Sequence, residues 1–326
     1  MHTAQQEGDA MSVLVAVEPD CWRRPVLAEA VERGGGTVST PDGASALVWA
    51  EPTQAQLIGE LVDANPGIEW VQLPYAGIEP VVDIVTARPA IEWYCGKGVY
   101  AEPVAEHALM LALAGMRGMA TYARATDWAA PEGRNLLGAS VTVLGGGGIT
   151  DSLLRLLAPF GCEVTVVRNR PMLSAPHGAA SSDTAGAARV VGPDELSQVL
   201  PGTDVLFLAL ALTTDTAGII GSAELAALPD HAWIVNVARG GHIVTDDLVE
   251  ALQNGQIGGA ALDVTDPEPL PDGHPLWSLP NCLITPHIGN TPEMGLALLA
   301  ERVTANVARR VAGEPLIGPV YLDLGY

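Results

Sequence analysis

A run of four glycines between an apolar strand and a leucine-rich helix constrains the fold of this chain most. The segment VTVLGGGGIT, residues 141–150, begins with a short β-branched stretch, and apolar residues then recur at helical spacing up to Phe160. A strand, a tight glycine turn and a helix make the first half of a βαβ unit, which is typical of a parallel sheet covered by helices. The sequence therefore predicts an α/β fold.

The same turn has the composition of a dinucleotide-binding loop. Gly145 and Gly147 occupy the first two positions of the pattern G-x-G-x-x-G, and Gly148 and Ile149 follow them into the helix. Glycines let a pyrophosphate approach the backbone, where the N–H groups and the dipole of the helix start bind its negative charge. Thr150 stands where the pattern has its third glycine, so an ordinary glycine-rich turn remains an open alternative.

The end of the next predicted strand, residues 163–167, indicates which cofactor such a loop would bind. An acidic residue there would accept hydrogen bonds from the ribose 2′-hydroxyl of NAD, but this chain has Arg168, Asn169 and Arg170. Two guanidinium groups would bind the 2′-phosphate of NADP through charged, bidentate hydrogen bonds. The sequence favours NADP, with NAD as the alternative, and two solvated surface arginines are the competing interpretation.

Strands and helices alternate along the remaining chain and predict two Rossmann-like domains, each a doubly wound parallel sheet. Residues 104–291 are predicted to form the dinucleotide-binding domain. Residues 1–103 and 292–326 are predicted to form a smaller, discontinuous, flavodoxin-like substrate domain, because a final long helix returns the chain to it. Within the larger domain, Ser222 and Thr245 are the predicted caps of two helices.

Composition narrows the possible partners. The net charge is −22, with 16 basic and 38 acidic residues, so most of the surface would repel a nucleic acid. The four cysteines lie far apart in the sequence, which predicts neither a metal site nor a disulfide framework. The chain shows no signal peptide and no membrane span. These features predict a cytoplasmic protein that binds neither nucleic acid nor membrane.

A loop in the predicted substrate domain is a candidate anion site. Tyr75, Ala76 and Gly77 follow a predicted strand, and loops at strand ends are where α/β sheets bind ligands. Their backbone N–H groups could hold a carboxylate. An ordinary turn before the next element is the alternative.

Three polar residues each follow a predicted strand of the larger domain. Arg239, Glu268 and His287 would converge at one edge of the sheet, because the carboxyl ends of parallel strands face one crevice. An arginine binds a carboxylate with two hydrogen bonds. A histidine beside a carboxylate can donate or accept a proton. With a nicotinamide, these groups would suffice to reduce a 2-oxo acid.

Each of these residues also has a structural interpretation. Arg239 could belong to a surface turn, Glu268 to a solvated loop, and His287 to the core. Two other histidines, His242 and His274, compete for the proton-transfer role, and their spacing does not exclude them.

Several segments together resemble one family. VNVARGGHIVTDDLVEAL, GGAALDVTDPEPLPDGHPLW and LITPHIGN are similar to signature segments of the D-isomer-specific 2-hydroxyacid dehydrogenases, in the order and spacing of that family. QLPYAGIE resembles the substrate loop, and VAEHALMLALA resembles the interdomain helix. The resemblance covers almost the whole chain.

The resemblance implies roles for individual residues. Arg239 would bind the substrate carboxylate, His287 would be the acid/base and Glu268 its partner. Tyr75, Ala76 and Gly77 would line the carboxylate loop. Contacts to the cofactor would come from Gly145, Gly147, Gly148, Ile149, Arg168, Asn169, Arg170, Ala238 and Asp263, the last two beside the nicotinamide.

The resemblance also implies an activity and an assembly. Arg168 in place of the usual acid points to a reductase that uses NADPH on a glyoxylate- or hydroxypyruvate-like 2-oxo acid, and the family typically forms homodimers. Oxidation of a 2-hydroxy acid with NAD is a second enzymatic hypothesis. A nucleotide-sensing regulator without turnover, like the corepressors of the family, is an alternative of another class.

Overall fold

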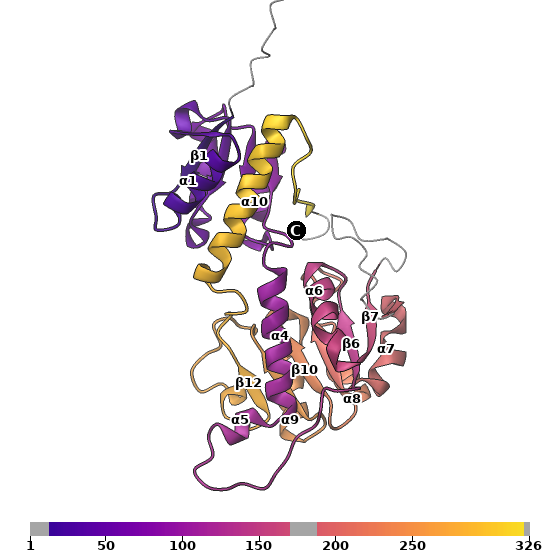
Figure 1. Cartoon of the computed structure of the whole chain (residues 1–326). Coiled ribbons are helices and arrows are strands. Elements are labelled where there is room, and N and C mark those ends of the chain that lie inside the picture. The colour runs from indigo at the N-terminus through magenta and orange to yellow at the C-terminus, as the bar shows by residue number, and fades with distance from the viewer. Residues whose placement is uncertain (1–12, 170–187, 323–326) are drawn as a thin grey trace, which may run out of the picture. The chain divides into compact units, whose positions relative to one another are not determined.

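The computed structural model describes residues 13–169 and 188–322. The chain forms two compact units, one built from residues 1–100 and 292–326 and the other from residues 101–291. Each unit has one parallel β-sheet with helices on its faces (Figure 1). The predicted α/β fold with two parallel sheets is therefore confirmed.

The smaller unit contains a five-stranded sheet. Its strands are β1 (Leu14–Glu18), β2 (Thr37–Ser39), β3 (Ala46–Trp49), β4 (Trp70–Gln72) and β5 (Glu92–Tyr94). Their order is β2-β1-β3-β4-β5 and every pair is parallel. This is the strand order of flavodoxin-like sheets.

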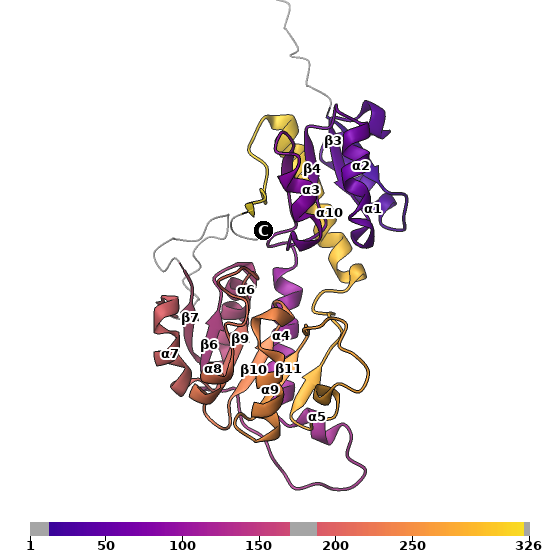
Figure 2. The same cartoon turned by 180° about the vertical axis from the view of Figure 1, so that it is seen from behind.

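Helices cover both faces of this sheet (Figure 2). The unit contains α1 (Arg24–Arg33), α2 (Leu57–Ala64), α3 (Val82–Thr86) and α10 (Pro292–Ala312). Helices α1 and α10 bury one core cluster against the sheet, while α2 and α3 bury the other. A Cβ at Gly34 would lie 2.7 Å from the carbonyl oxygen of Thr304, so the end of α1 can approach α10 closely only with glycine there.

The larger unit contains a seven-stranded sheet of order β12-β11-β10-β9-β6-β7-β8. Chain order reverses between β6 and β9, and ligands bind at such a switch point in open α/β sheets. The strands are β6 (Ser140–Leu144), β7 (Glu163–Val167), β8 (Arg189–Val191), β9 (Val205–Leu208), β10 (Trp233–Asn236), β11 (Gly259–Leu262) and β12 (Cys282–Ile284).

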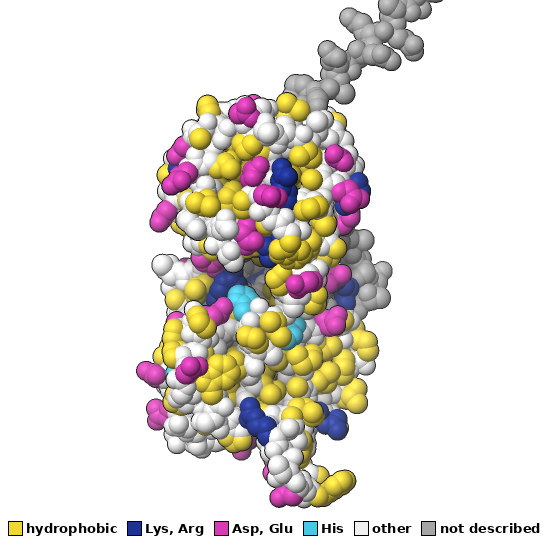
Figure 3. Space-filling view, turned by 90° about the vertical axis from the view of Figure 1, so that its left-hand side faces the viewer, with side chains coloured by type: hydrophobic (Ala, Val, Ile, Leu, Met, Phe, Trp, Pro, Cys, Tyr) yellow, Lys and Arg dark blue, Asp and Glu magenta, His cyan; other side chains and the backbone are white. Residues whose placement is uncertain are grey.

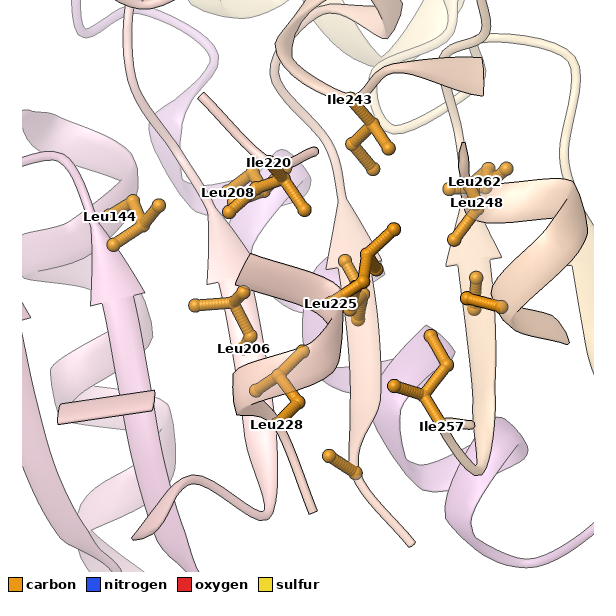
Figure 4. Close-up of a cluster of buried hydrophobic side chains, with 14 of the residues drawn as sticks. Leu144, Leu206, Leu208, Ile220, Leu225, Leu228, Ile243, Leu248, Ile257 and Leu262 are labelled. Atoms are coloured by element: carbon orange, nitrogen blue, oxygen red, sulfur yellow. The ribbon is translucent and has the colours of Figure 1, made fainter. Parts of the chain in front are cut away.

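Two helical layers enclose the seven-stranded sheet. One face is covered by α4 (Ala101–Met116) and α6 (Gly148–Leu157), and the other mainly by α8 (Ser222–Ala227) and α9 (Thr245–Gln253). Leucine and isoleucine side chains of the strands interdigitate with those of α8 and α9 (Figure 4). The unit also contains α5 (Met119–Tyr122) and α7 (Leu196–Val199).

The two predicted helix caps were wrong by one residue. Ser222 and Thr245 are the first residues of their helices, and the preceding Gly221 and Val244 have extended backbone and occupy the cap position. The Gly221 N–H donates to the Glu224 carboxylate at 3.1 Å. In the described part of the chain, no helix is both long and apolar enough to cross a membrane.

Candidate active site

The glycine turn after β6 lies at the switch point and packs closely against the end of the neighbouring strand, β9. Gly145 has φ +114, and a Cβ there would lie 2.2 Å from the carbonyl oxygen of Ala209, so no other residue fits. A Cβ at Gly147, in contrast, would meet nothing within 4 Å. The backbone at the start of α6 therefore has open space beside it, which fits a bound pyrophosphate.

Thr150 replaces the third glycine of the pattern without loss of packing. Its side chain is buried, and its hydroxyl donates a hydrogen bond of 3.0 Å to the Gly145 carbonyl. Gly148 begins α6, and Ile149 packs against the core beneath the sheet. The threonine thus ties the helix to the turn that a dinucleotide would approach.

Arg168 lies beside this turn. Its backbone N–H donates to the Val191 carbonyl at 3.1 Å. A Cβ at Gly146 would lie 2.4 Å from the Cδ of Arg168, so the arginine stem rests on the glycine loop. Burial raises the pKa of Asp151 in the first turn of α6, and the positive charge of Arg168 opposes that rise. Asn169 is exposed, and Arg170 lies outside the described residues.

The loop after β10 carries Arg239. The buried Asn236 shapes it, because its side chain accepts a hydrogen bond from the Ala238 N–H at 3.0 Å and donates one to the Arg239 carbonyl at 2.8 Å. The Arg239 guanidinium donates to the Ala238 carbonyl at 2.8 Å. A Cβ at Gly240 would lie 2.0 Å from the carbonyl of Thr265. The loops after β10 and β11 are therefore in direct backbone contact, which sequence reasoning missed.

Glu268 and His287 form a pair across the next two strand ends. The Nδ1 atom of His287 lies 2.6 Å from a carboxylate oxygen of Glu268, and both side chains are about half exposed. The backbone N–H of Thr265 points to the other carboxylate oxygen at 3.4 Å. The described residues provide no hydrogen-bond partner for Nε2 of His287. This ring therefore presents one nitrogen to its carboxylate partner and the other to solvent.

Asp263 holds the loop that carries His287. One carboxylate oxygen accepts hydrogen bonds from the Thr285 hydroxyl at 2.6 Å and the Ile288 N–H at 2.9 Å, and the other accepts the Gly289 N–H at 2.8 Å. Burial opposes ionisation, but these bonds and one from His107 lower the pKa of Asp263 to about 2. Its predicted contact with a nicotinamide stays a prediction, since both oxygens face its own chain.

The two rival histidines have other partners. His242 is fully buried, with Nδ1 3.0 Å from the Thr216 carbonyl and Nε2 3.2 Å from the Leu210 carbonyl. Nδ1 of His274 accepts a hydrogen bond from the Leu276 N–H at 3.3 Å. Both rings are engaged in holding backbone, so His287 is the better candidate for proton transfer.

The smaller unit presents the predicted carboxylate loop at the end of β4. The Tyr75 hydroxyl donates to the Pro52 carbonyl at 2.9 Å, and burial raises the pKa of this phenol. Among the described residues, none accepts a hydrogen bond from the N–H groups of Ala76 or Gly77. These amides remain available for an anion.

Comparison with known proteins identifies the family. Residues 107–289 match the model of the D-isomer specific 2-hydroxyacid dehydrogenase NAD-binding domain. An uncharacterized protein of Corynebacterium melassecola is 38% identical over 82% of this chain and 86% of its own length. A glyoxylate/hydroxypyruvate reductase A of Klebsiella pneumoniae is 42% identical, over 41% of this chain and 43% of its own length.

Solved structures share the whole fold. A D-isomer specific 2-hydroxyacid dehydrogenase of Xanthobacter autotrophicus, in complex with NADPH and MES, has a TM-score of 0.78 and 25% identity over 97% of this chain and 100% of its own. An NADPH-dependent glyoxylate/hydroxypyruvate reductase of Sinorhizobium meliloti, in complex with NADP and sulfate, has a TM-score of 0.76 and 25% identity with the same coverage. With the two parallel sheets and the family match over more than half of its length, this chain belongs to the D-isomer-specific 2-hydroxyacid dehydrogenase family, whose enzymes use a nicotinamide cofactor.

Proposed function

We propose that this enzyme reduces a small 2-oxo acid of the glyoxylate or hydroxypyruvate type to the D-2-hydroxy acid with NADPH. The observation that carries the proposal is the pair between Glu268 and His287, whose Nε2 has no hydrogen-bond partner among the described residues. When bound, the nicotinamide would supply a hydride to the carbonyl carbon. His287 would donate the proton to the carbonyl oxygen, and Glu268 would stabilise the charged ring.

Arg239 would bind the substrate carboxylate, because a guanidinium offers two parallel hydrogen bonds to a carboxylate. Within the smaller unit, the N–H groups of Ala76 and Gly77 are donors that an anion could use. The partial relatives named glyoxylate/hydroxypyruvate reductase A support a small substrate side chain.

Arg168 would favour NADPH over NADH. Its stem rests on Gly146 beside the glycine loop, where a guanidinium could bind a 2′-phosphate with full charge. Related structures bind either cofactor: those of Xanthobacter and Sinorhizobium contain NADPH or NADP, and that of Lactobacillus delbrueckii contains NAD.

The test is cofactor oxidation followed at its absorbance, with NADPH and NADH in parallel. Substrates would be glyoxylate, hydroxypyruvate, pyruvate, phenylpyruvate and branched 2-oxo acids. We expect the highest kcat/KM with NADPH and the two smallest acids. Cofactor binding without turnover of any acid would contradict the reductase and favour a nucleotide-sensing regulator.

Cofactor choice is tested separately with Arg168→Asp. We expect NADPH affinity to fall by about 100-fold or more and NADH affinity to change much less, because only the 2′-phosphate loses its charged partner. The exposed Arg189 offers a matched control, and Arg189→Asp should leave both affinities unchanged. Equal losses for both cofactors in Arg168→Asp would refute the 2′-phosphate contact.

We also propose that the enzyme is a homodimer formed through the larger unit. An open groove of about 1130 Å³ lies between α4, α5 and the segment up to Glu132. Leu109, Met110 and Leu113 line it, and Trp128 beside it is fully exposed. Hydrophobic side chains gather on this unit above the segment that protrudes after α5 (Figure 3). A second copy would cover this apolar surface.

Sedimentation of two variants would test the dimer. Met110→Asp should shift the protein to monomers, because a charge would be buried in the interface. Leu57 in the smaller unit has nearly the same exposure, 41% against 43%, so Leu57→Asp should leave the assembly unchanged. A monomeric wild-type protein at micromolar concentration would refute the proposal.

A further inference from the structure

The side chain of His107 contacts residues that hold the loop of His287. It lies on α4, and its side chain is only 12% exposed. Its Nε2 lies 3.0 Å from the Thr285 hydroxyl and 3.2 Å from the nearer carboxylate oxygen of Asp263. A Cβ at Gly289 would lie 3.6 Å from the His107 ring. The helix therefore packs directly on the segment that carries the candidate acid/base.

The direction of these hydrogen bonds follows from the donors present. The Thr285 hydroxyl has one hydrogen and donates it to Asp263 at 2.6 Å. Nε2 of His107 must then donate to the threonine oxygen, the carboxylate or both, since neither offers it a proton. His107, on the packed helix α4, is thus a hydrogen-bond donor to the cluster of Thr285 and Asp263. The Asp263 carboxylate also accepts hydrogen bonds from Thr285, Ile288 and Gly289.

This cluster determines where His287 lies. Residues 285, 288 and 289 are all bound to the Asp263 side chain. The backbone N–H of His287 donates to the Asp263 carbonyl at 2.8 Å. Its φ is +53, the only positive value at a non-glycine position among the described residues. A strained backbone persists only where its surroundings fix it, and here hydrogen bonds on both sides of His287 do so.

The helix that carries His107 is itself firmly placed. Ala105 and Ala108, on either side of it, are fully buried. A Cβ at Gly115 would lie 2.3 Å from the Trp233 ring on β10, so α4 approaches the sheet as closely as glycine permits. His107 therefore connects a rigid helix to the loop that carries His287, whose side chain is half exposed.

From these contacts we infer that His107 is a positioning residue for His287, acting through Asp263 and Thr285. This inference rests on the proposed role of His287 as the proton donor. Loss of the donor on α4 leaves the strained loop with fewer restraints, and a displacement of about 1 Å at a reacting group can cost as much as 100-fold in rate. The effect should fall on kcat, because His107 contacts neither the glycine turn nor Arg168.

Two variants of His107 separate positioning from packing. His107→Leu fills similar space without a donor, and we expect kcat to fall about tenfold while the NADPH dissociation constant stays near wild type and the melting temperature falls by a few degrees at most. His107→Gln places an amide N–H near the former Nε2 and should recover most of kcat. The control is Glu102→Gln, which also lies on α4 and removes only an exposed ion pair with Arg155 of α6. This variant should match wild type.

Hydrogen exchange gives a readout that does not depend on turnover. The amides of Ile288 and Gly289 should exchange at least about threefold faster in His107→Leu than in wild type or His107→Gln, since their bonds to Asp263 open more often. Wild-type kcat or wild-type exchange in His107→Leu would overturn the inference. Equal losses in both His107 variants, with lower melting temperatures, would make the role one of packing and would overturn it too.

The same experiment distinguishes this inference from the proposed function. If the wild-type enzyme reduces no 2-oxo acid, the proposed function fails, and hydrogen exchange alone decides whether His107 restrains the loop. If wild type is active and the His107 variants are equally active, the positioning role fails and the proposed function stands.

Discussion

Two histidines of the larger unit lie in loops that follow strands of the same sheet, but they differ in burial and in hydrogen-bond partners. His242 is fully buried, and each ring nitrogen lies against a backbone carbonyl. His287 is half exposed, with one nitrogen against the Glu268 carboxylate and its backbone at φ +53. The first ring connects its own loop to the segment of Leu210 and Thr216, whereas the second lies within a loop that is restrained on both sides of it.

The difference lies in the partners and not in the residue type. A carbonyl can only accept a hydrogen bond, so the nitrogen of His242 that carries the proton donates to one of the two backbone carbonyls beside the ring. A carboxylate on one nitrogen can stabilise a charged ring, and the other nitrogen of His287 has no hydrogen-bond partner among the described residues. Burial and partners thus make His242 a structural residue and His287 the candidate for proton transfer.

Of the changes that test this comparison, the replacement of His287 should have the largest effect, a loss of kcat. His287→Ala removes the proposed proton donor, and we expect kcat to fall by about 100-fold or more, equivalent to about 2.7 kcal/mol. Stability should change by less than about 1 kcal/mol because the ring is half exposed. Steady-state kinetics and denaturant titration measure the two quantities. His274→Ala is the matched loop control, and near-normal rates in His287→Ala would end the assignment.

His242→Ala should show the reverse pattern. It leaves one backbone carbonyl without its donor and removes a fully buried ring, so the free energy of unfolding should fall by roughly 2 to 3 kcal/mol. Turnover per folded molecule should be retained, since the ring faces the core. Urea unfolding and activity normalised to folded protein test this prediction. A large loss of kcat with unchanged stability would reverse the roles of the two histidines.

Asp263→Asn tests whether the loop of His287 is held by charge. The pKa of Asp263 falls from about 3.8 to about 2 on folding, which corresponds to about 2 kcal/mol of stability. That stability is present above about pH 4 and is lost as the pH falls towards 2. The variant should therefore be less stable than wild type at pH 7, with the difference shrinking in acid. Asp272→Asn, an exposed control, should show no difference at any pH.

Glu268→Gln should have the smallest effect of the four. The amide oxygen can still accept from Nδ1 of His287, but the negative charge is lost. We expect kcat to fall about tenfold, or about 1.4 kcal/mol. Measurement beside Glu250→Gln, an exposed change on α9, controls for charge. A loss as large as that of His287→Ala would mean that the carboxylate takes a more direct part in proton transfer.

Much of the fold could be predicted from local pattern. The β-branched run at 141–144 and the strand at 163–167 became β6 (Ser140–Leu144) and β7 (Glu163–Val167), because buried parallel strands are continuous apolar runs bounded by glycine or polar residues. Edge strands β2, β5 and β8 have three residues each and are too short for a periodic signal. The cap at Gly221, with Glu224 three residues on, was missed because the prediction placed the cap at Ser222.

The candidate site was predictable in part for a similar reason. Arg239, Glu268 and His287 each follow a strand, so the parallel sheet alone brings their loops to one edge. The close contact between Gly240 and Thr265, and the contact of Asp263 with His107, could not be predicted. They join residues distant in sequence, and no local pattern encodes such pairs.

The sequence by itself determined the alternation of strands and helices, the glycine turn and the acidic surface, because these depend on side-chain size, polarity and spacing along the chain. The tertiary structure decided which histidine is half exposed beside a carboxylate, how Thr150 replaces a glycine, and which groups hold the loop of His287. Those properties depend on burial and on hydrogen-bond partners, and both arise only when distant segments pack together.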